Sequence, residues 1–402
     1  MPAPPFSSRL NWDLAPNRLS QLLNEKRAAG ATILDLTESN PTSAGFAYPS
    51  DAILSALADP RSHRYEPAAA GMPVARAAVS DYYSGALGMD VRPDRILLTA
   101  STSEAYAFVF KLLADPGDEV LAPSPSYPLF DYLAALDAVR IVQYPLVYQG
   151  TPPVSTKSWT IDFDALTRSI TARSRAIVLV NPNNPTGSFL KRSELGALLA
   201  LCREHNLALI SDEVFADYAF HDDPHLVRSL TGIDEVLTFC LSGLSKVAAL
   251  PQLKLGWIVT GGPPGDRETA FERLELIADT YLSVSATVQW AAPALLGLRA
   301  PLQRQILGRV LANRSFLASQ IGPTSPWSLL ATEGGWYAVL EAPRIQSEEE
   351  WVLNLLIEDG VLVQPGFFFD FEREAFLVIS LLTAEDIFRQ GIRRILARAE
   401  PR

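Results

Sequence analysis

Short apolar segments alternate with segments of helical periodicity between about residues 96 and 260. Short apolar runs are typical of strands buried on both faces, and helical patterns between them are typical of crossover connections. The predicted strands are Ile96–Thr99, Glu119–Ala122, Arg140–Pro145, Ala176–Asn181, Ala208–Asp212, Val236–Leu241 and Leu255–Thr260, and the predicted helices are Ser103–Ala114, Tyr127–Leu136 and Lys191–His205. We therefore expect an α/β unit with three αβα layers around a mostly parallel, seven-stranded sheet.

The pattern changes after about Leu282 and predicts a second, smaller α+β unit. Its predicted elements are one long helical stretch, three strands, a closing helix and one helix near the N-terminus: Val288–Leu317, Gly334–Leu340, Val361–Gln364, Phe376–Leu382, Asp386–Arg398 and Asn17–Ala29. The predicted division gives a large domain over residues 49–285. Residues 1–48 and 286–402, from both chain ends, form the small domain.

Composition narrows the function to small-molecule chemistry. The 402 residues are 48% hydrophobic and 20% charged, which is typical of a globular protein, and the net charge of −11 disfavours nucleic acid as a partner. No apolar run is long enough to predict a membrane span. Four scattered histidines predict no metal site, and Cys202 and Cys240, both in apolar runs, predict reduced thiols in a cytoplasmic protein.

Ligands of such sheets bind beyond the carboxyl ends of the strands, so the residues that follow each strand are the candidates. Ser101, Thr102 and Ser103 open a predicted helix, where free backbone N–H groups and hydroxyls favour an anion such as phosphate. The same residues also fit an ordinary helix N-cap. Tyr127 follows the second strand and would stack on a flat ring, although by itself a tyrosine there is more typical of packing in the core or at its rim.

Three further strand ends carry polar groups. Asn184 lies in Asn-Pro-Asn-Asn-Pro-Thr-Gly, which is either a plain turn or a rigid mount for an amide that binds a phenolate oxygen. Asp212 ends an apolar strand, where it either caps a helix or pairs with a protonated ring nitrogen. Lys246 follows Ser245 in an otherwise apolar stretch, so it is either a surface lysine or a desolvated amine nucleophile.

Together the five sites describe one ligand. A phosphate cradle, a stacking aromatic ring, a phenolate donor, a carboxylate for a ring nitrogen and an amine for an aldehyde match the functional groups of pyridoxal 5′-phosphate. Each site is ambiguous by itself, and the joint argument is stronger than any of its parts.

At these residues the sequence resembles the class I and II aminotransferases, which are fold-type I pyridoxal-phosphate enzymes. The most specific matches are Asn-Asn-Pro-Thr-Gly at 183–187, Asp-Glu-Val at 212–214 and Ser245-Lys246. The resemblance implies that Lys246 forms a Schiff base with the cofactor and then moves a proton. It also implies that Asp212 pairs with the pyridine nitrogen, Asn184 bonds the phenolic oxygen and Tyr127 stacks on the ring.

The resemblance extends to the phosphate, the substrate and the oligomer. It implies that Ser101, Thr102 and Ser103 hold the phosphate, and that Asn40 lies where the N-terminal segment approaches the substrate's carboxylate. Tyr65 matches a tyrosine that reaches the phosphate of the neighbouring subunit's site, which implies a homodimer.

Four positions depart from the family pattern. Phe215 stands where many members have a tyrosine that bonds the phenolic oxygen, and Gly243 replaces a phosphate-binding serine. Lys254 replaces a phosphate-binding arginine and keeps its charge without the bidentate geometry. At Val378 the family has an arginine that grips the substrate's carboxylate, so the chain lacks that clamp in this register.

The resemblance implies an aminotransferase that moves an amino group between a small amino acid and a 2-oxo acid in a ping-pong cycle. The same cofactor also serves lyases, decarboxylases, racemases and oxidases, and Val378 keeps these alternatives open. A non-catalytic ligand sensor with this fold is a third hypothesis, although the chain shows no basic helix-turn-helix segment.

Overall fold

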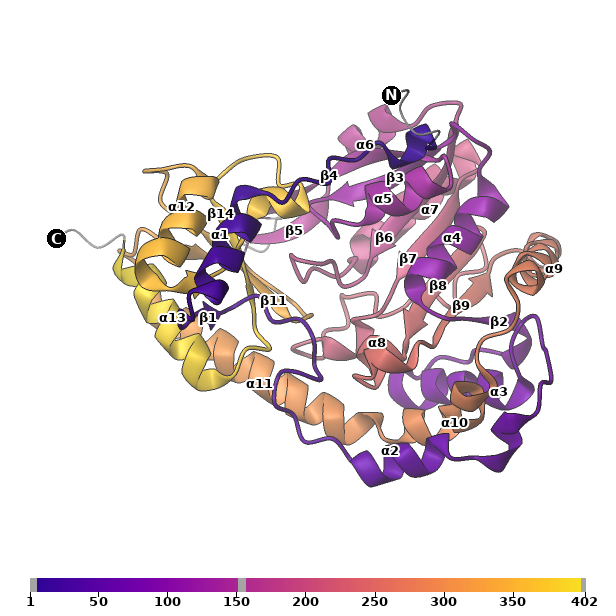
Figure 1. The fold of residues 1–402 in the computed structure, drawn as a ribbon. Coiled ribbons are helices and arrows are strands. Elements are labelled where there is room, and N and C mark those ends of the chain that lie inside the picture. Colours follow the sequence, from indigo (N-terminus) through magenta and orange to yellow (C-terminus); the bar gives the residue numbers. More distant parts are fainter. Residues whose placement is uncertain (1–5, 151–156, 399–402) are drawn as a thin grey trace, which may run out of the picture.

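An eight-stranded sheet forms the centre of the larger unit in the computed structural model, which describes residues 6–150 and 157–398 (Figure 1). The strand order is β2-β9-β8-β7-β6-β3-β4-β5. The bounds are β2 Ile96–Thr99, β3 Glu119–Ser124, β4 Arg140–Gly150, β5 Lys157–Ile161, β6 Ser174–Val180, β7 Ala208–Asp212, β8 Thr238–Gly243 and β9 Gly256–Gly261. β4, β3, β6, β7 and β8 are parallel, whereas β9 and β5 pair antiparallel with their neighbours. The mostly parallel sheet is therefore confirmed, with all seven predicted strands present and β5 as an additional edge strand.

Alternating side chains of the strands divide between two helical layers. In β6, Ile177 and Leu179 face one core cluster and Val178 and Val180 face the other. The first cluster contains side chains of α3 (Pro73–Tyr82), α6 (Phe163–Ser169), α7 (Arg192–His205) and α10 (Ala286–Gly297). The second contains side chains of α4 (Thr102–Leu113), α5 (Phe130–Leu136) and α9 (Pro264–Tyr281). The predicted three-layer αβα arrangement is confirmed.

The smaller unit joins both ends of the chain. A four-stranded antiparallel sheet has the order β10-β11-β14-β13, and β1 pairs parallel with β12. These strands are β1 Leu34–Asp35, β10 Ser328–Leu329, β11 Tyr337–Glu341, β12 Val361–Leu362, β13 Gln364–Pro365 and β14 Phe376–Ser380. The surrounding helices are α1 Arg18–Ala28, α11 Arg299–Gln320, α12 Glu348–Asn354 and α13 Glu385–Ala397, and α1 lies beside the C-terminal helices in Figure 1.

The predicted helical stretch 288–317 is two helices, α10 and α11, and they belong to different cores. Buried side chains of α10, among them Val288 and Leu295, pack in the cluster of the large sheet together with α2 (Ser50–Leu57). Buried side chains of α11, among them Ile306 and Val310, pack in the cluster of the small unit. The domain boundary at 285/286 stays a prediction, and these contacts favour a boundary between α10 and α11.

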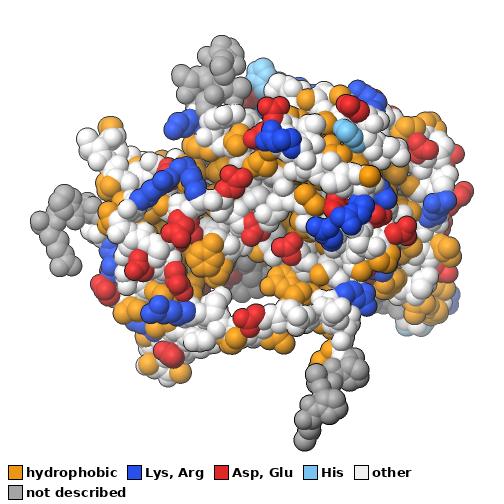
Figure 2. All heavy atoms as spheres, turned by 90° about the horizontal axis from the view of Figure 1, so that it is seen from above, with side chains coloured by type: hydrophobic (Ala, Val, Ile, Leu, Met, Phe, Trp, Pro, Cys, Tyr) orange, Lys and Arg blue, Asp and Glu red, His pale blue; other side chains and the backbone are white. Residues whose placement is uncertain are grey.

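The face of the molecule that Figure 2 shows has no large area of a single type of side chain. In Figure 2, acidic and basic side chains are interspersed with hydrophobic ones on the face seen from above, as is usual for a folded protein. Within the described residues, no helix combines the length and the apolar character that crossing a membrane requires.

The loop after β6 is fixed against the smaller unit through a glycine. The backbone oxygen of Gly187 accepts the N–H groups of Glu333 at 3.1 Å and Gly334 at 3.0 Å. Gly187 has a φ of +67°, and a Cβ there would lie 2.3 Å from the Gly334 oxygen. The loop therefore requires glycine for its conformation and for the close backbone contact.

We predict that Gly187→Ala lowers the free energy of unfolding by about 2 kcal/mol or more, because it combines a left-handed conformation with a backbone clash. Gly196→Ala is the matched control. Gly196 lies exposed in the helix α7 with open space around its Cα, so alanine there stabilises by up to about 1 kcal/mol. Urea unfolding of both variants measures the difference, and equal stabilities would contradict the proposed contact.

Candidate active site

A cavity of about 220 Å³ lies at the carboxyl ends of β6, β7 and β8, between the large sheet and the smaller unit. Residues from both units line it: Ser39, Thr102, Ser103, Tyr106, Tyr127, Leu133, Val180, Asn184, Asp212, Val214, Phe215, Gly243, Ser245, Lys246, Leu255 and Tyr337. Eight residues predicted from the sequence are among them, so the strand-end rule located the cavity.

Asp212 ends β7 and is buried. Its Oδ2 accepts the hydroxyl of Tyr106 at 3.1 Å and its Oδ1 accepts the N–H of Val214 at 3.2 Å. Burial raises the pKa of the Asp212 carboxyl to about 6, while these two donors and the charge of Lys246 act in the opposite direction. At neutral pH the carboxylate is therefore ionised and held in a fixed orientation.

Lys246 lies on α8 (Leu244–Val247), the short helix that follows β8. Its Nζ lies 4.6 Å from the ring centroid of Trp336 and 5.3 Å from that of Phe215. Burial lowers the pKa of the Lys246 amine to about 8, and the negative charge of Asp212 opposes this shift. A much larger fraction of the amine is therefore neutral at physiological pH than for an exposed lysine.

The N-terminus of α4 and the turn after β8 form one end of the cavity. The side chains of Thr102, Ser103 and Ser245 line this end together with Gly243. A Cβ on Gly243 would lie 2.9 Å from the backbone oxygen of Leu255. The close approach of this neighbouring backbone segment explains why glycine replaces the serine of the family pattern. Hydroxyls and helix N–H groups at one place suit a phosphate group.

The cavity is also lined by Asn184, Tyr127 and Phe215. The Oδ1 atom of Asn184 is buried and has no hydrogen-bond partner in the described part of the chain. Phe215 is buried, and its ring contacts Trp336 edge-on at 5.2 Å between centroids. Phenylalanine has no hydroxyl, so Asn184 is the polar side chain left to meet a phenolic oxygen here.

Four predicted residues lie outside the cavity lining. Ser101 is the N-cap of α4, and its Oγ accepts the Glu104 N–H at 3.2 Å, so the capping interpretation describes its side chain. Lys254 is exposed, Tyr65 is 75% exposed, and Asn40 is exposed with its amide donating to Ser43 Oγ at 2.9 Å. Their roles toward the phosphate and the substrate stay predictions.

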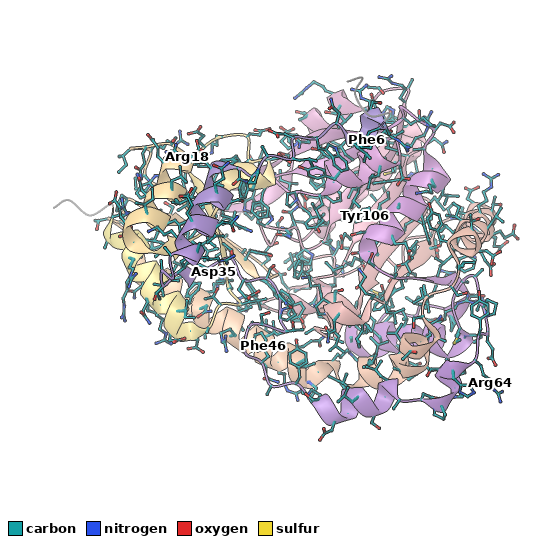
Figure 3. All side chains as sticks on the ribbon, in the orientation of Figure 1. Phe6, Arg18, Asp35, Phe46, Arg64 and Tyr106 are labelled. Atoms are coloured by element: carbon teal, nitrogen blue, oxygen red, sulfur yellow. The ribbon has the colours of Figure 1, made fainter. Side chains whose placement is uncertain are left out.

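Several lining residues were missed from the sequence. Tyr106, labelled near the middle of the molecule in Figure 3, follows Ser103 by three residues on α4, so helical periodicity places both on one face. That spacing was a usable signal. Ser39 and Tyr337 come from the smaller unit, and no local pattern connects them with strand ends of the large sheet.

Val378 lies in β14 and is fully buried. It packs in a hydrophobic cluster with Trp159, Leu330, Val339, Phe369 and Phe376. The valine is therefore a core residue of the small sheet, and this position provides no guanidinium group.

The polar groups of the cavity fit pyridoxal 5′-phosphate. Thr102, Ser103 and Ser245 would hold the phosphate, Asp212 the pyridine nitrogen, Asn184 the phenolic oxygen and Lys246 the aldehyde. The buried Oδ1 of Asn184, which has no hydrogen-bond partner among the described residues, and the desolvated amine of Lys246 are polar groups that a ligand would satisfy.

The sequence model of the class I and II aminotransferases matches residues 31–395. The chain belongs to the class I and II aminotransferases. Enzymes of this family use pyridoxal 5′-phosphate, so the predicted family, cofactor and aminotransferase function are confirmed. The family assignment favours transamination over the other pyridoxal-phosphate reactions.

Named relatives cover most of this aminotransferase. A glutamate-pyruvate aminotransferase of Escherichia coli is 28% identical over 367 residues, which cover 89% of this chain and 88% of the relative. An alanine aminotransferase of Mycobacterium bovis is 30% identical over 350 residues, which cover 84% and 79%. The solved structure of an alanine aminotransferase from Pyrococcus furiosus has a TM-score of 0.86 at 24% identity, covers 98% and 99% of the two chains, and shows the shared fold.

We predict that the apoenzyme takes up pyridoxal 5′-phosphate faster as pH rises, with a plateau above about pH 8, because only the unprotonated amine of Lys246 bonds an aldehyde. A lysine with the ordinary pKa of 10.5 would show no plateau there. In Asp212→Asn the plateau begins at lower pH, because the charge that favours the protonated amine is gone. Stopped-flow absorbance measures the rate, and a rate still rising well above pH 8 would contradict the buried amine.

Proposed function

We propose that this aminotransferase moves the amino group between a small amino acid and a 2-oxo acid by a ping-pong mechanism, with Lys246 as the residue that bonds the cofactor. The observation that carries the proposal is that the desolvated amine of Lys246 and the buried carboxylate of Asp212 line one cavity and shift each other's pKa. When bound, the cofactor supplies the aldehyde for this bond and a ring that accepts the electrons left when the substrate's Cα proton departs.

Asp212 keeps the ring nitrogen protonated through its negative charge. The hydroxyl of Tyr106 and the N–H of Val214 fix the carboxylate in place, which prevents it from turning toward Lys246. Tyr106 is therefore a positioning residue for Asp212. A protonated ring nitrogen needs an ionised partner, and the pKa of about 6 provides one at neutral pH.

Lys246 would have a second role when the cofactor and the substrate are both bound. Its amine would accept the proton that leaves the substrate's Cα and would later donate a proton back. A pKa of about 8 suits both directions, because the amine accepts and donates protons near neutral pH. The rings of Phe215 and Trp336 exclude water on this side of the amine.

The remaining predicted contacts belong to the same proposal. Thr102, Ser103 and Ser245 hold the phosphate, Asn184 bonds the phenolic oxygen and Tyr127 stacks on the ring. Ser101 contributes as the cap that fixes the first turn of α4, and Lys254 as a positive charge adjacent in sequence to the lining residue Leu255. Asn40 stays a candidate for the substrate side. The activities in the names of the relatives make alanine with 2-oxoglutarate, and glutamate with pyruvate, the first pairs to test.

The assembly we propose is a cytoplasmic homodimer in which Tyr65 reaches the neighbouring site. Tyr65 is 75% exposed and Leu282 is 68% exposed. Their segments lie side by side, because Ala68 N–H donates to Ser283 Oγ at 2.9 Å. Exposed apolar side chains at one place favour a protein contact. The free, buried thiols of Cys202 and Cys240 fit a reducing compartment.

We predict that Lys246→Ala loses the visible absorbance of the bound cofactor and at least about a thousandfold in turnover, because no other group bonds the aldehyde. The matched control is Lys26→Ala, which removes a half-exposed lysine of α1 that lies outside the cavity lining, and leaves activity unchanged. A panel of amino acids and 2-oxo acids, with both products quantified, provides the assay. Equal amounts of new amino acid and new oxo acid support transamination, whereas release of ammonia or CO₂ supports a lyase or decarboxylase. Undiminished turnover by Lys246→Ala would remove this lysine from the mechanism.

We predict a particle of twice the 43.9 kDa chain mass by light scattering. Leu282→Asp shifts it toward the monomer, because a buried charge without a partner opposes association. Ile345→Asp is the matched control, since Ile345 is 71% exposed but lies in the smaller unit. A monomeric wild type, or equal effects of the two variants, would refute this interface.

A further inference from the structure

The cavity contains one positive side chain among the described residues that line it, and this is Lys246. In the proposed function that amine bonds the cofactor. The other ionised lining residue is Asp212, which is negative. A substrate carboxylate that enters the cavity therefore meets no guanidinium from this part of the chain, and must find hydrogen-bond donors to offset its loss of water.

The position where the family has its carboxylate-binding arginine is closed by packing. Val378 pairs with Val339 across β11 and β14, and the aromatic rings of Trp159, Phe369 and Phe376 belong to the same cluster. Trp159 comes from β5, the additional edge strand. The cluster fills this space with apolar atoms. The guanidinium of Arg373 lies 5.0 Å from the ring centroid of Phe376, but it forms an ion pair with Glu341 at 3.3 Å and does not line the cavity.

An uncharged donor lines the same side of the cavity. Tyr337 begins β11, packs partly against that cluster and faces the cavity together with Ser39. Burial raises the pKa of the Tyr337 hydroxyl to about 12, and the neighbouring side chain of Ser39 acts in the opposite direction. The hydroxyl therefore stays protonated at physiological pH and is able to donate to an anion.

Tyr337 and Ser39 belong to the smaller unit, whereas Asp212, Lys246, Thr102 and Ser103 lie on the large unit. The proposed cofactor contacts all come from the large unit. The substrate must reach Lys246 from the side opposite the large unit, and Tyr337 lines that side of the cavity.

We propose that Tyr337, which lines the cavity beside Ser39, binds the carboxylate of the substrate through its uncharged hydroxyl, so that this enzyme recognises its substrate without a guanidinium clamp. The inference rests on the proposed function and assigns a specificity-determining residue within it. It also has a consequence for selectivity. A phenol donates to the oxygen of a carboxamide as well as to a carboxylate, whereas an arginine strongly prefers the anion.

Binding of unreactive ligands to the cofactor-loaded enzyme tests the proposal directly. Propanoate and propanamide present the two oxygen groups without an amine, and calorimetry gives their Kd values. We expect the two ligands to bind the wild type within roughly tenfold of each other, and Tyr337→Phe to weaken both by about tenfold to a hundredfold. Ser39→Ala should weaken the binding of both ligands by a smaller factor, and Ser39→Thr should keep the wild-type Kd values.

The matched control is Tyr148→Phe. Tyr148 packs against the same cluster, and its hydroxyl accepts the N–H of Ala331 at 2.9 Å outside the cavity lining. We expect this variant to keep the wild-type Kd for propanoate. Because Tyr148→Phe also removes a hydroxyl beside the cluster, it separates a general disturbance of packing from the loss of a ligand contact. Retained cofactor absorbance shows that each variant is folded.

Turnover distinguishes the failure of this inference from the failure of the proposed function. If amino acids react and Tyr337→Phe lowers kcat/KM mainly through KM, the proposal is supported. If they react and Tyr337→Phe leaves both KM and the Kd of propanoate unchanged, or if only amines without a carboxylate react, the inference is overturned while transamination stands. If no amine or amino acid reacts with any oxo acid, the proposed function itself fails.

Discussion

In the proposed function, the chemistry of this aminotransferase depends on keeping the Lys246 amine and the Asp212 carboxylate in one space that excludes most water. Desolvation acts on the two groups in opposite directions, since it lowers the pKa of the amine to about 8 and raises that of the carboxyl to about 6. Each charge moderates the shift of the other. At pH 7, which lies between these values, the carboxylate is ionised and part of the amine is neutral.

That condition is created by both units of the fold. β7 and β8 are neighbours in register, which places the two functional groups at one edge of the sheet. Tyr337 is the first residue of β11, and Trp336 is the residue before it. Without these two rings the amine of Lys246 would face solvent. The smaller unit is held there by the contact of Gly187 with Gly334 and by the ion pair of Lys191 with Glu333 at 2.8 Å. The loop that carries Asn184 is thereby tied to the wall on the substrate side.

Sequence reasoning reached the parts of this arrangement that follow from local pattern. Apolar runs located the strands, and the rule that ligands bind beyond their carboxyl ends located Asp212, Asn184 and Lys246. Reasoning from the sequence failed where contacts join segments that are distant along the chain. β5 forms only by pairing with β4, and α10 and α11 separate because each packs in a different core. Ser39 and Tyr337 reach the cavity through the assembly of the smaller unit, which periodicity does not describe.

Three of the four departures from the family pattern, at Phe215, Gly243 and Val378, share one physical direction. Phe215 and Val378 are apolar at positions where the family has a polar or a charged side chain. Gly243 lacks the family's hydroxyl, because the backbone at Leu255 lies too close for any Cβ. Fewer competing polar groups strengthen the remaining interactions, because charges and dipoles act more strongly in a drier cavity. The low pKa of Lys246 and the high pKa of Tyr337 follow from the same dryness. A site of this kind relies on a few uncharged donors in fixed positions, and its selectivity follows from where those donors lie.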